Sequence, residues 1–400
     1  MQIISLTEIQ FKNYSRIHSR RNYFQSVEFA NFQKNRGYQV LYIGLLDDSD
    51  NVIAASLILG KTILGKYLYG YVPGGYLINY DDVQTFKKFS ELLKKYLYKL
   101  NYVYIIVNSL ITIKEYDKKG NIISNHDKYI ELFETSEYVK SKQKELNVCA
   151  KLNLIKKDSV YNNFSRFVKR NIKDAKFKGI KIIKGSVNDV EKFYYFIKKK
   201  DKHNINYYKG LFNNLNTENN KFEIYFAYMD TNEYLKNCHI ALNKEKAKNE
   251  KLRQKLLKNN NNTNIVYKMQ SDKLIDKYDN ELSKAIQLNT QYKDGTIVAT
   301  VGIIKTNNTI NFVVDGYDSN LKFIKSSYLI KWEIIKEYLK LGYTNFNLGY
   351  LPDYQEKFKG LYLSRIGFNC NIYIEPGQYN LIVNNMIYKF ISIADKDKYN

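Results

Sequence analysis

The sequence predicts a mixed α+β protein in which one helix–strand unit occurs twice and the second unit carries a long helical hairpin. Three observations lead to this prediction. The order of predicted helices and strands in the first half recurs in the second half. Residues between 235 and 292 form a seam at alternating three- and four-residue steps, the spacing of paired helices. The chain has 400 residues, 44% of them hydrophobic, which is enough for two domains.

The first unit is expected within residues 1–150. Pro73-Gly74-Gly75 interrupts the apolar pattern after a strand, and Asp81-Asp82 precede a helix. In chain order we predict a helix over 26–36, strands over 39–46, 52–59 and 66–72, a helix after Asp82 that buries Phe86, Phe89, Leu93 and Leu97, and a strand over 102–107.

The second unit is expected over residues 151–230 and 295–400, and its elements follow the same order. We predict a helix over 189–200, strands over 222–228, 297–305 and 309–314, a helix capped by Ser326 or Ser327 that ends at Gly342, and a strand over 344–348. The repetition indicates a duplicated unit.

Residues 231–294 interrupt the second unit where the first unit has only the polar turn 47–51. The seam predicts two antiparallel helices joined by the polar segment 259–264. Its residues are Leu235, Cys238, Leu242, Glu245, Asn249, Leu252 and Leu256, then Leu274, Tyr278, Glu281, Ala285, Leu288 and Tyr292. Because Glu245 and Asn249 stand among them, we expect a loosely held coiled-coil hairpin.

A helix, a hairpin, a second helix and a strand in this order form the core pattern of an N-acetyltransferase-like (GNAT) fold. Other α+β proteins share similar element orders. Two copies indicate a tandem arrangement with a ligand cleft between them. We therefore predict an α+β fold with two tandem GNAT-like domains and an antiparallel coiled-coil arm, residues 231–294, inserted in the second.

The formal net charge of +23 favours polyanionic partners: nucleic acid, a phosphorylated metabolite or an anionic membrane surface. An AT-rich genome would also enrich the chain in Lys, Asn, Ile and Tyr, so part of this charge need not serve binding. Cys149, Cys238 and Cys370 are far apart, and no His stands at metal-ligand spacing from a Cys or another His.

These observations exclude several classes of protein. We expect no metal, no cofactor and no disulfide framework. The N-terminus lacks the basic and apolar regions of a signal peptide, and no apolar run reaches the roughly 18 residues of a membrane span. The expected compartment is the reducing cytoplasm.

Five short segments along the chain form an ordered set of motifs. They are Tyr-Phe-Gln-Ser-Val-Glu-Phe-Ala at 23–30, Asn-Val-Ile-Ala-Ala at 51–55, Phe-Val-Lys-Arg-Asn-Ile-Lys-Asp-Ala at 167–175, Gly-Leu-Tyr-Leu-Ser-Arg-Ile-Gly-Phe at 360–368 and the closing strand at 379–384. No single motif is specific, but their order and spacing together cover nearly the whole chain and resemble those of the Fem-type peptidoglycan aminoacyltransferases.

The resemblance implies transfer of an amino acid, Gly, Ala or Ser, from aminoacyl-tRNA to a stem-peptide amine of a peptidoglycan precursor. The partners would be the aminoacyl-tRNA and a lipid-linked or nucleotide-linked precursor, both anionic. A lipid-linked acceptor would place the protein peripherally at the inner face of the cell membrane. The donor is an activated ester, so the reaction requires alignment, proton removal and oxyanion stabilisation.

The family signature G-L-x-x-F-K-x-G-F carries a lysine that can supply positive charge to the tetrahedral intermediate. Here Ser364-Arg365 replaces its Phe-Lys pair, and arginine keeps the charge with a different geometry. The resemblance thus points to Arg365 as catalytic, with Lys359 as the alternative under a shifted alignment. A surface arginine paired with a carboxylate is the non-catalytic interpretation of Arg365.

Five residues are predicted to bind substrate. Asn108 stands where related enzymes often have an aspartate, and its amide can orient an amine but cannot accept a proton. Tyr207 and Lys209 occupy the segment where a phosphate-binding arginine is expected. Lys34 and Arg36 end the first helix and are expected to face the cleft, although cations also suit any helix C-terminus.

Contacts with tRNA are predicted at two places. Lys169, Arg170 and Lys173 form a basic cluster near two phenylalanines, which fits either phosphate binding or a solvated helix face. The first arm helix is also basic, and the resemblance implies tRNA binding through Lys251 and Arg253. Such arms also mediate packing and dimerisation, so the oligomeric state stays open.

Two other functions remain compatible with the sequence. An acyl-CoA-dependent N-acyltransferase would need a glycine-rich pyrophosphate loop at a helix start, and the glycines near Gly70 and Gly74 lack that spacing. A non-catalytic tRNA- or RNA-binding protein would need only the arm and the charge.

Overall fold

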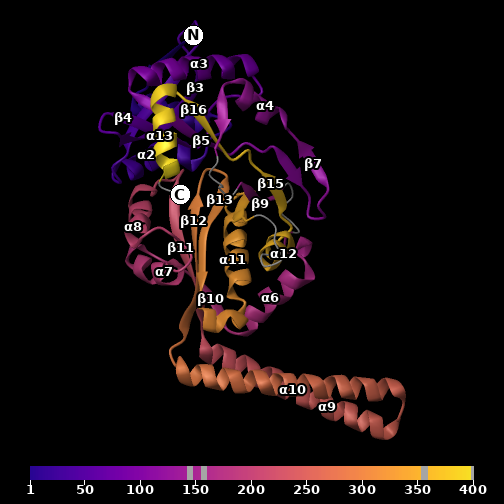
Figure 1. The fold of residues 1–400 in the computed structure, drawn as a ribbon. Coiled ribbons are helices and arrows are strands. Elements are labelled where there is room, and N and C mark those ends of the chain that lie inside the picture. Colours follow the sequence, from indigo (N-terminus) through magenta and orange to yellow (C-terminus); the bar gives the residue numbers. More distant parts are fainter. Residues whose placement is uncertain (142–146, 155–159, 353–358, 398–400) are drawn as a thin grey trace.

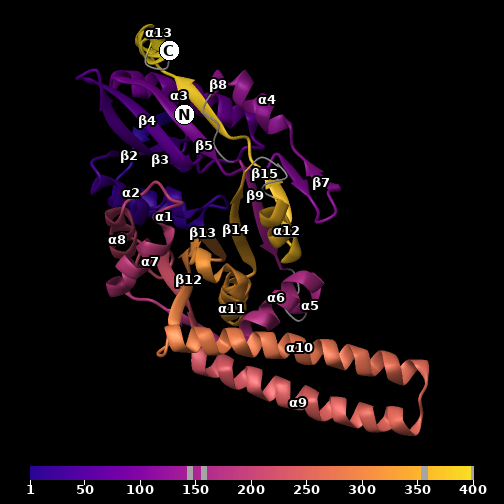
Figure 2. The ribbon, with the colours of Figure 1, turned by 60° about the horizontal axis from the view of Figure 1, so that its bottom comes forward.

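The computed structural model describes residues 1–141, 147–154, 160–352 and 359–397. Figure 1 shows two bodies of sheet and helix stacked on each other, with the helical arm projecting sideways from the second body. Figure 2 shows that the C-terminal helix lies on the first body, on the side away from the arm.

The first body is built on a seven-stranded sheet. Its strands, in spatial order, are β1 (Gln2–Ser5), β2 (Gln39–Leu46), β3 (Val52–Ile63), β4 (Tyr67–Gly74), β5 (Tyr102–Ser109), β16 (Gln378–Ile382) and β8 (Tyr138–Lys140). Helix α3 (Val83–Lys99) covers one face, because Phe86, Phe89 and Leu93 recur at helical spacing and are fully buried. Asp82 caps this helix by accepting the N–H of Thr85.

The second body is built on a nine-stranded sheet. Its strands, in spatial order, are β10 (Ile180–Lys184), β11 (Lys221–Met229), β12 (Thr296–Lys305), β13 (Thr309–Tyr317), β14 (Asn345–Leu351), β9 (Val148–Asn153), β15 (Asn371–Ile374), β6 (Lys114–Tyr116) and β7 (Ile122–Asn125). Helices α6 (Arg166–Phe177) and α11 (Ser326–Lys340) pack against each other over this sheet.

The remaining helices complete both bodies. They are α1 (Glu8–Ile17), the 3₁₀ turn η1 (Tyr23–Gln25), α2 (Val27–Lys34), α4 (Lys128–Thr135), α5 (Val160–Asn163), η2 (Val187–Asp189), α7 (Val190–Ile197), α8 (Ile205–Asn214), η3 (Ser319–Ile324), α12 (Lys359–Gly367) and α13 (Asn385–Asp397). A continuous apolar core joins α1 and α2 of the first body to α7 and α8 of the second, which fixes how the two bodies meet. None of the helices in the described residues is long and apolar enough to cross a bilayer.

The two sheets exchange strands across the predicted boundary at residue 150. Strands β6, β7 and β9 come from the first part of the chain and its boundary, yet they lie in the second sheet. Strand β16, the predicted closing strand, lies in the first sheet, where it pairs with β5 and β8. The domain ranges therefore stay a prediction about the sequence repeat, and sheet membership does not follow them.

Two long helices, α9 (Thr231–Lys258) and α10 (Asn262–Gln291), connect β11 directly to β12. These two strands pair along their length, from Lys221 with Lys305 to Met229 with Thr296, as if a short turn joined them. The polar turn is shorter than predicted, because Asn261 caps α10 by accepting the N–H of Asn264.

Polar residues in the arm seam have partners across the hairpin. Glu245 accepts a 2.7 Å hydrogen bond from the Ser271 hydroxyl, and the Asn249 amide donates to Asp272 over 2.8 Å. These bonds satisfy groups that were expected to loosen the hairpin, and they specify its register. The coiled-coil geometry itself stays a prediction of the sequence.

Candidate functional site

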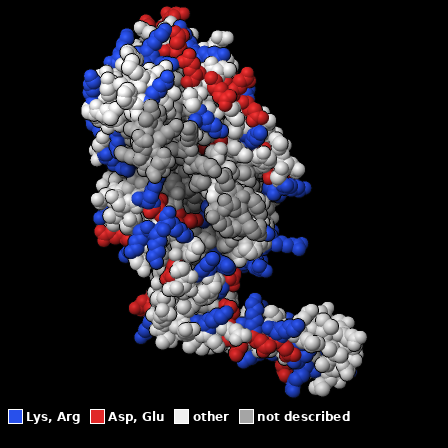
Figure 3. Space-filling view, viewed as in Figure 1, with Lys and Arg blue, Asp and Glu red and all other residues white. Residues whose placement is uncertain are grey.

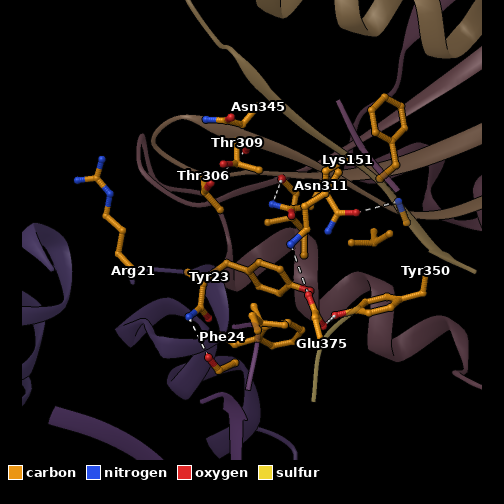
Figure 4. Close-up of a pocket in the computed structure, with 18 of the residues that line it drawn as sticks. Arg21, Tyr23, Phe24, Lys151, Thr306, Thr309, Asn311, Asn345, Tyr350 and Glu375 are labelled. Carbon is orange, nitrogen blue, oxygen red and sulfur yellow. Dashed lines mark hydrogen bonds and ion pairs between the residues drawn. The ribbon is translucent and has the colours of Figure 1, made fainter. Parts of the chain in front are cut away.

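A cavity of about 670 Å³ opens between the two bodies (Figure 4). The first body contributes the segment before η1 and the ends of β4 and β5. The second body contributes β9, the start of α8, the β12–β13 turn and β14. The cavity thus lies between the two bodies, which is where the sequence predicts a ligand cleft.

Strands β13 and β14 form one wall of this cavity because they diverge. They pair in parallel only from Thr309 with Asn345 to Asn311 with Asn347. The side chains of Thr309, Asn311, Asn345 and Asn347 line the cavity at this point. Asn347 accepts the N–H of Gly349 at 3.0 Å, which turns the chain away from β13. The opening is therefore lined by neutral hydrogen-bonding groups.

A buried carboxylate, Glu375, lies in the same cavity, directly after β15. It is only 2% exposed, and it accepts a 2.9 Å hydrogen bond from the Tyr350 hydroxyl (Figure 4). Lys151 Nζ lies 3.5 Å away, and the Cys149 thiol lies 3.6 Å away. This is the one arrangement in the described cavity that joins a buried acid to a cation and a phenol.

Burial is the largest influence on the protonation of this cluster. Burial raises the pKa of Glu375. The Lys151 ammonium lowers this pKa, but by less than burial raises it. For Lys151, burial is outweighed by Cys149 and Glu375, so its pKa is also raised. Burial raises the pKa of Cys149 to about 12, which keeps it a thiol and a poor nucleophile at neutral pH. Glu375 therefore takes up a proton more readily than an exposed carboxylate does, whereas Cys149 stays a thiol at neutral pH.

Cations and aromatic rings form the mouth of the cavity. Arg20 and Arg21 line it, and the Arg20 guanidinium lies 5.6 Å from the Tyr80 ring centre. Tyr23 and Phe24 stack at 4.0 Å between their centroids. Gly74, at φ +75°, accepts a hydrogen bond from Asn22, and a side chain at this position would collide with that asparagine.

A second polar group, on the segment leading into α8, also faces the cavity. His203 Nδ1 lies 2.7 Å from Asp201 Oδ1, and its ring stacks on Tyr207 with centroids 3.8 Å apart. Burial raises the pKa of Tyr207 to about 12, so this ring remains a neutral phenol.

The predicted substrate-binding residues are only partly brought together. Tyr207 lines the cavity, and the Arg36 guanidinium lies 4.9 Å from its ring centre. Lys34 is exposed and does not line the cavity. Lys209 is also outside it, and it pairs with Glu191 at 3.0 Å on the outer face of α7. The arginines at the mouth are instead Arg20 and Arg21.

Asn108 is one residue away from the cavity lining. It lies on β5 opposite Gln378 of β16, whereas its neighbour Ser109 lines the cavity. Successive residues of a strand face opposite sides, so the two cannot both point inward. A contact between Asn108 and substrate stays a prediction that this register does not support.

Arg365 is not a surface arginine, because it is 7% exposed on α12. Its Nε has no hydrogen-bond partner among the described residues. Its guanidinium lies 3.9 Å from where a side chain of the cavity residue Gly349 would begin. Lys331, which bonds to Asp315 at 2.6 Å, and then Arg365 hold the pKa of that carboxyl below its usual range. Lys359, the alternative, is exposed at the start of α12.

The predicted tRNA-binding residues lie outside the cavity. Lys169, Arg170 and Lys173 are on α6, where Lys169 donates to the Asn162 carbonyl and Arg170 lies 5.8 Å from the Phe167 ring centre. Of the two phenylalanines near them, Phe167 is exposed and Phe164 is core. Lys251 and Arg253 are exposed on α9, and Arg253 pairs with Glu250.

Sequence reasoning missed Glu375, Lys151 and His203. An isolated acid after an apolar strand, Ile372-Tyr373-Ile374-Glu375, was a usable signal for the first of these. Lys151 and His203 stand among many lysines and polar residues, so nothing local marked them. Among the described residues, no three His, Cys, Asp or Glu side chains are grouped to hold a metal ion.

Comparisons with known proteins agree with this architecture. The chain is similar to the aminoacyltransferase FemB of Staphylococcus epidermidis (strain ATCC 12228), at 25% identity over 99% of this chain and 98% of that protein. It is also similar to the aminoacyltransferase FemA of Staphylococcus aureus (strain MW2), at 22% identity over 100% and 99%.

Two solved structures share the fold. The crystal structure of FemX matches with a TM-score of 0.71 at 14% identity, over 98% of this chain and 100% of that chain. A tandem GNAT protein from clavulanic acid biosynthesis matches with a TM-score of 0.51 at 6% identity, over 96% and 98%. The predicted resemblance and the GNAT-like architecture are thus confirmed. The model of the FemAB family matches residues 6–396, and the chain therefore belongs to that family.

Proposed function

We propose that this protein transfers an amino acid, Gly, Ala or Ser, from aminoacyl-tRNA to the stem-peptide amine of a peptidoglycan precursor and so builds the interpeptide bridge. Family membership, with matched relatives named aminoacyltransferases, makes the chain an enzyme of the transferase class. The observation that carries the proposed reaction is the position of Glu375, a buried carboxylate beside the opening between β13 and β14.

Glu375 supplies the base that an asparagine at position 108 cannot supply. The acceptor amine attacks the ester carbonyl carbon, and an amide C–N bond forms while the ester C–O bond to the ribose breaks. The amine proton passes to Glu375, which then donates it to the ribose oxygen as that oxygen leaves as a hydroxyl. A carboxylate whose pKa is raised by burial is a stronger base once ionised, and Tyr350 holds it in place.

Positive charge near the reacting carbonyl would stabilise the oxyanion. Arg365 is the candidate, because it lies behind Gly349 of the cavity wall and has an unpartnered Nε among the described residues. Its second role is structural, since it faces Asp315 together with Lys331. A small acyl group such as Gly, Ala or Ser fits an opening lined by threonine and asparagine side chains.

The two anionic substrates would approach from different sides. Arg20 and Arg21 at the mouth suit the diphosphate of a precursor, and the α6 cluster of Lys169, Arg170 and Lys173 suits tRNA phosphates. A lipid-linked acceptor would bring the protein to the inner face of the cell membrane.

A transfer assay tests this function. Purified protein is mixed with radiolabelled aminoacyl-tRNAs and with lipid-linked or nucleotide-linked stem-peptide precursors. We expect label on the precursor, which identifies the amino acid and the acceptor together. Binding of tRNA regardless of its aminoacylation, with no label transferred, would instead indicate a non-catalytic RNA-binding protein. Transfer from an acyl-CoA alone would indicate the other rival.

A further inference from the structure

The tip of the arm is both basic and apolar. Residues 251–271 contain five cations, Lys251, Arg253, Lys255, Lys258 and Lys268, and no acid. Large apolar side chains are exposed among them: Leu257 is 80% exposed, Met269 55%, Tyr267 53% and Val266 49%. In Figure 3 the end of the arm carries no acidic side chain on the visible face. This composition differs from the middle of the arm, where acidic and basic residues alternate.

Packing within the hairpin does not account for these side chains. Leu252 and Leu256 of α9 are half-buried in the seam, whereas Leu257 points to solvent. Arg253 pairs with Glu250 and Lys268 with Asp272, just outside this segment. Lys251, Lys255 and Lys258 form no ion pair with any described residue. Exposed apolar residues gathered in one place on a solvated helix end indicate a partner surface.

The position of the tip also matters. The 28 residues of α9 make it about 42 Å long at 1.5 Å per residue, and only its first turns, with Tyr234 and Cys238, are buried in the core of the second body. The β6–β7 hairpin projects to the same side in both ribbon views (Figures 1 and 2). That hairpin exposes Ile122 at 61% and Ile123 at 53%, next to Lys118 and Lys119 in its turn. Two apolar and basic projections can therefore meet one flat surface.

We propose that the arm tip binds the surface of an anionic phospholipid bilayer. Leu257, Val266, Tyr267 and Met269 would enter the interfacial region, and the surrounding lysines and arginine would meet lipid phosphates. RNA would be bound by the cations and could stack a base on Tyr267, but it gives no reason for the exposed aliphatic side chains of Leu257 and Val266. The inference deepens the proposed function, because a lipid-linked acceptor would lie at the same surface.

The test compares two double variants of the full chain in a vesicle sedimentation assay. L257Q/M269Q removes exposed apolar side chains at the tip. I240Q/I286Q is the matched control, because Ile240 and Ile286 are 56% and 50% exposed near the base of the same hairpin. With vesicles of phosphatidylglycerol and phosphatidylcholine, we expect the tip variant to bind about tenfold or more weakly than the parent, and the control to bind like the parent. Vesicles of phosphatidylcholine alone should bind all three weakly.

Several results would overturn the inference. One such result is that the parent protein does not bind anionic vesicles. Another is that L257Q/M269Q and I240Q/I286Q bind anionic vesicles equally well. Weaker tRNA binding by K255Q/K258Q with unchanged vesicle binding would make the arm an RNA contact, as predicted for Lys251 and Arg253. Circular dichroism should show equal helix content in all variants. Transfer to a soluble, nucleotide-linked acceptor should be unchanged in L257Q/M269Q, so a failure of the proposed function is detected separately.

Discussion

The two copies of the repeated unit share a topology but differ at one pair of strands. In the first copy, β4 and β5 stay paired from Leu68 with Tyr102 to Gly74 with Ser109. In the second copy, the corresponding strands β13 and β14 separate after Asn311 and Asn347. The closed pair, β4 and β5, is mostly apolar and aromatic. The open pair, β13 and β14, carries threonine and asparagine side chains that line the cavity. The comparison teaches that both copies line the cavity, but the polar opening is present only where the strands of the second copy separate.

The largest effect is expected at the carboxylate beside the open pair. Glu375→Gln should lower the transfer rate by about 10²–10⁴-fold, because the amide cannot accept the amine proton. Since burial raises the pKa of Glu375, transfer by the parent should rise with pH through a value above the usual range of a carboxyl, and the variant should lack this limb. A pH–rate profile of kcat/KM measures both.

A matched control for this variant is Glu223→Gln. Glu223 is 4% exposed on β11, accepts a hydrogen bond from the Tyr225 hydroxyl and does not line the cavity. Its loss should lower thermal stability and leave the pH profile of transfer unchanged. If Glu375→Gln behaves like this control, the carboxylate is structural.

The next largest effect is expected at Arg365. Arg365→Ala should reduce transfer on the order of 10²-fold, because it removes a cation beside the cavity wall. Arg365→Lys should recover part of the rate, since it keeps the charge but not the planar fork. Single-turnover transfer and thermal unfolding separate catalysis from folding. Full transfer by a folded Arg365→Ala protein would contradict the assignment.

A smaller effect is expected from making the open pair resemble the closed one. Asn311→Leu places an apolar side chain in the cavity wall, as at the closed strands of the first copy. We expect transfer to fall roughly tenfold, through loss of a hydrogen-bonding group, with little change in melting temperature. Asn308→Leu, on the exposed turn next to β13, is the control and should transfer like the parent.

The smallest effect is expected at Lys209, a predicted substrate-binding residue that the structure places outside the cavity. Lys209→Ala breaks an exposed ion pair with Glu191. The transfer rate and the equilibrium constant for unfolding should therefore each change by less than about twofold. A large rise in KM for the precursor would show that this lysine reaches the substrate after all.

Much of the fold follows from local patterns in the sequence. Strands 39–46, 222–228 and 297–305 agree with β2, β11 and β12 to within a residue or two at each end, because β-branched and aromatic runs are bounded by polar turns. The arm helices follow from their seam residues. Strand exchange could not be predicted, because Tyr379 and Leu381 of β16 would pair equally well with either sheet on local grounds.

The candidate site was less predictable than the fold. Of the predicted substrate-binding residues, Tyr207 lines the cavity, whereas Lys34 and Lys209 were chosen by position along the chain and lie outside it. The role of Asn108 stays a prediction, because the neighbouring Ser109 lines the cavity and the sequence alone does not determine which residues face inward at the end of β5. Glu375 matters only because β15 brings it beside Tyr350 and Lys151, a contact between distant segments.

The place of β16 has a consequence for synthesis of the protein. Strand β5 emerges from the ribosome before β16, its neighbour on one side, which is translated only after the nine strands of the second sheet. The first sheet therefore cannot be completed until the second sheet has been synthesised, and until then an edge containing Tyr104, Ile105 and Ile106 lacks its final partner. A messenger that ends before codon 378 would yield a protein with that edge permanently open, so truncations that remove β16 should aggregate.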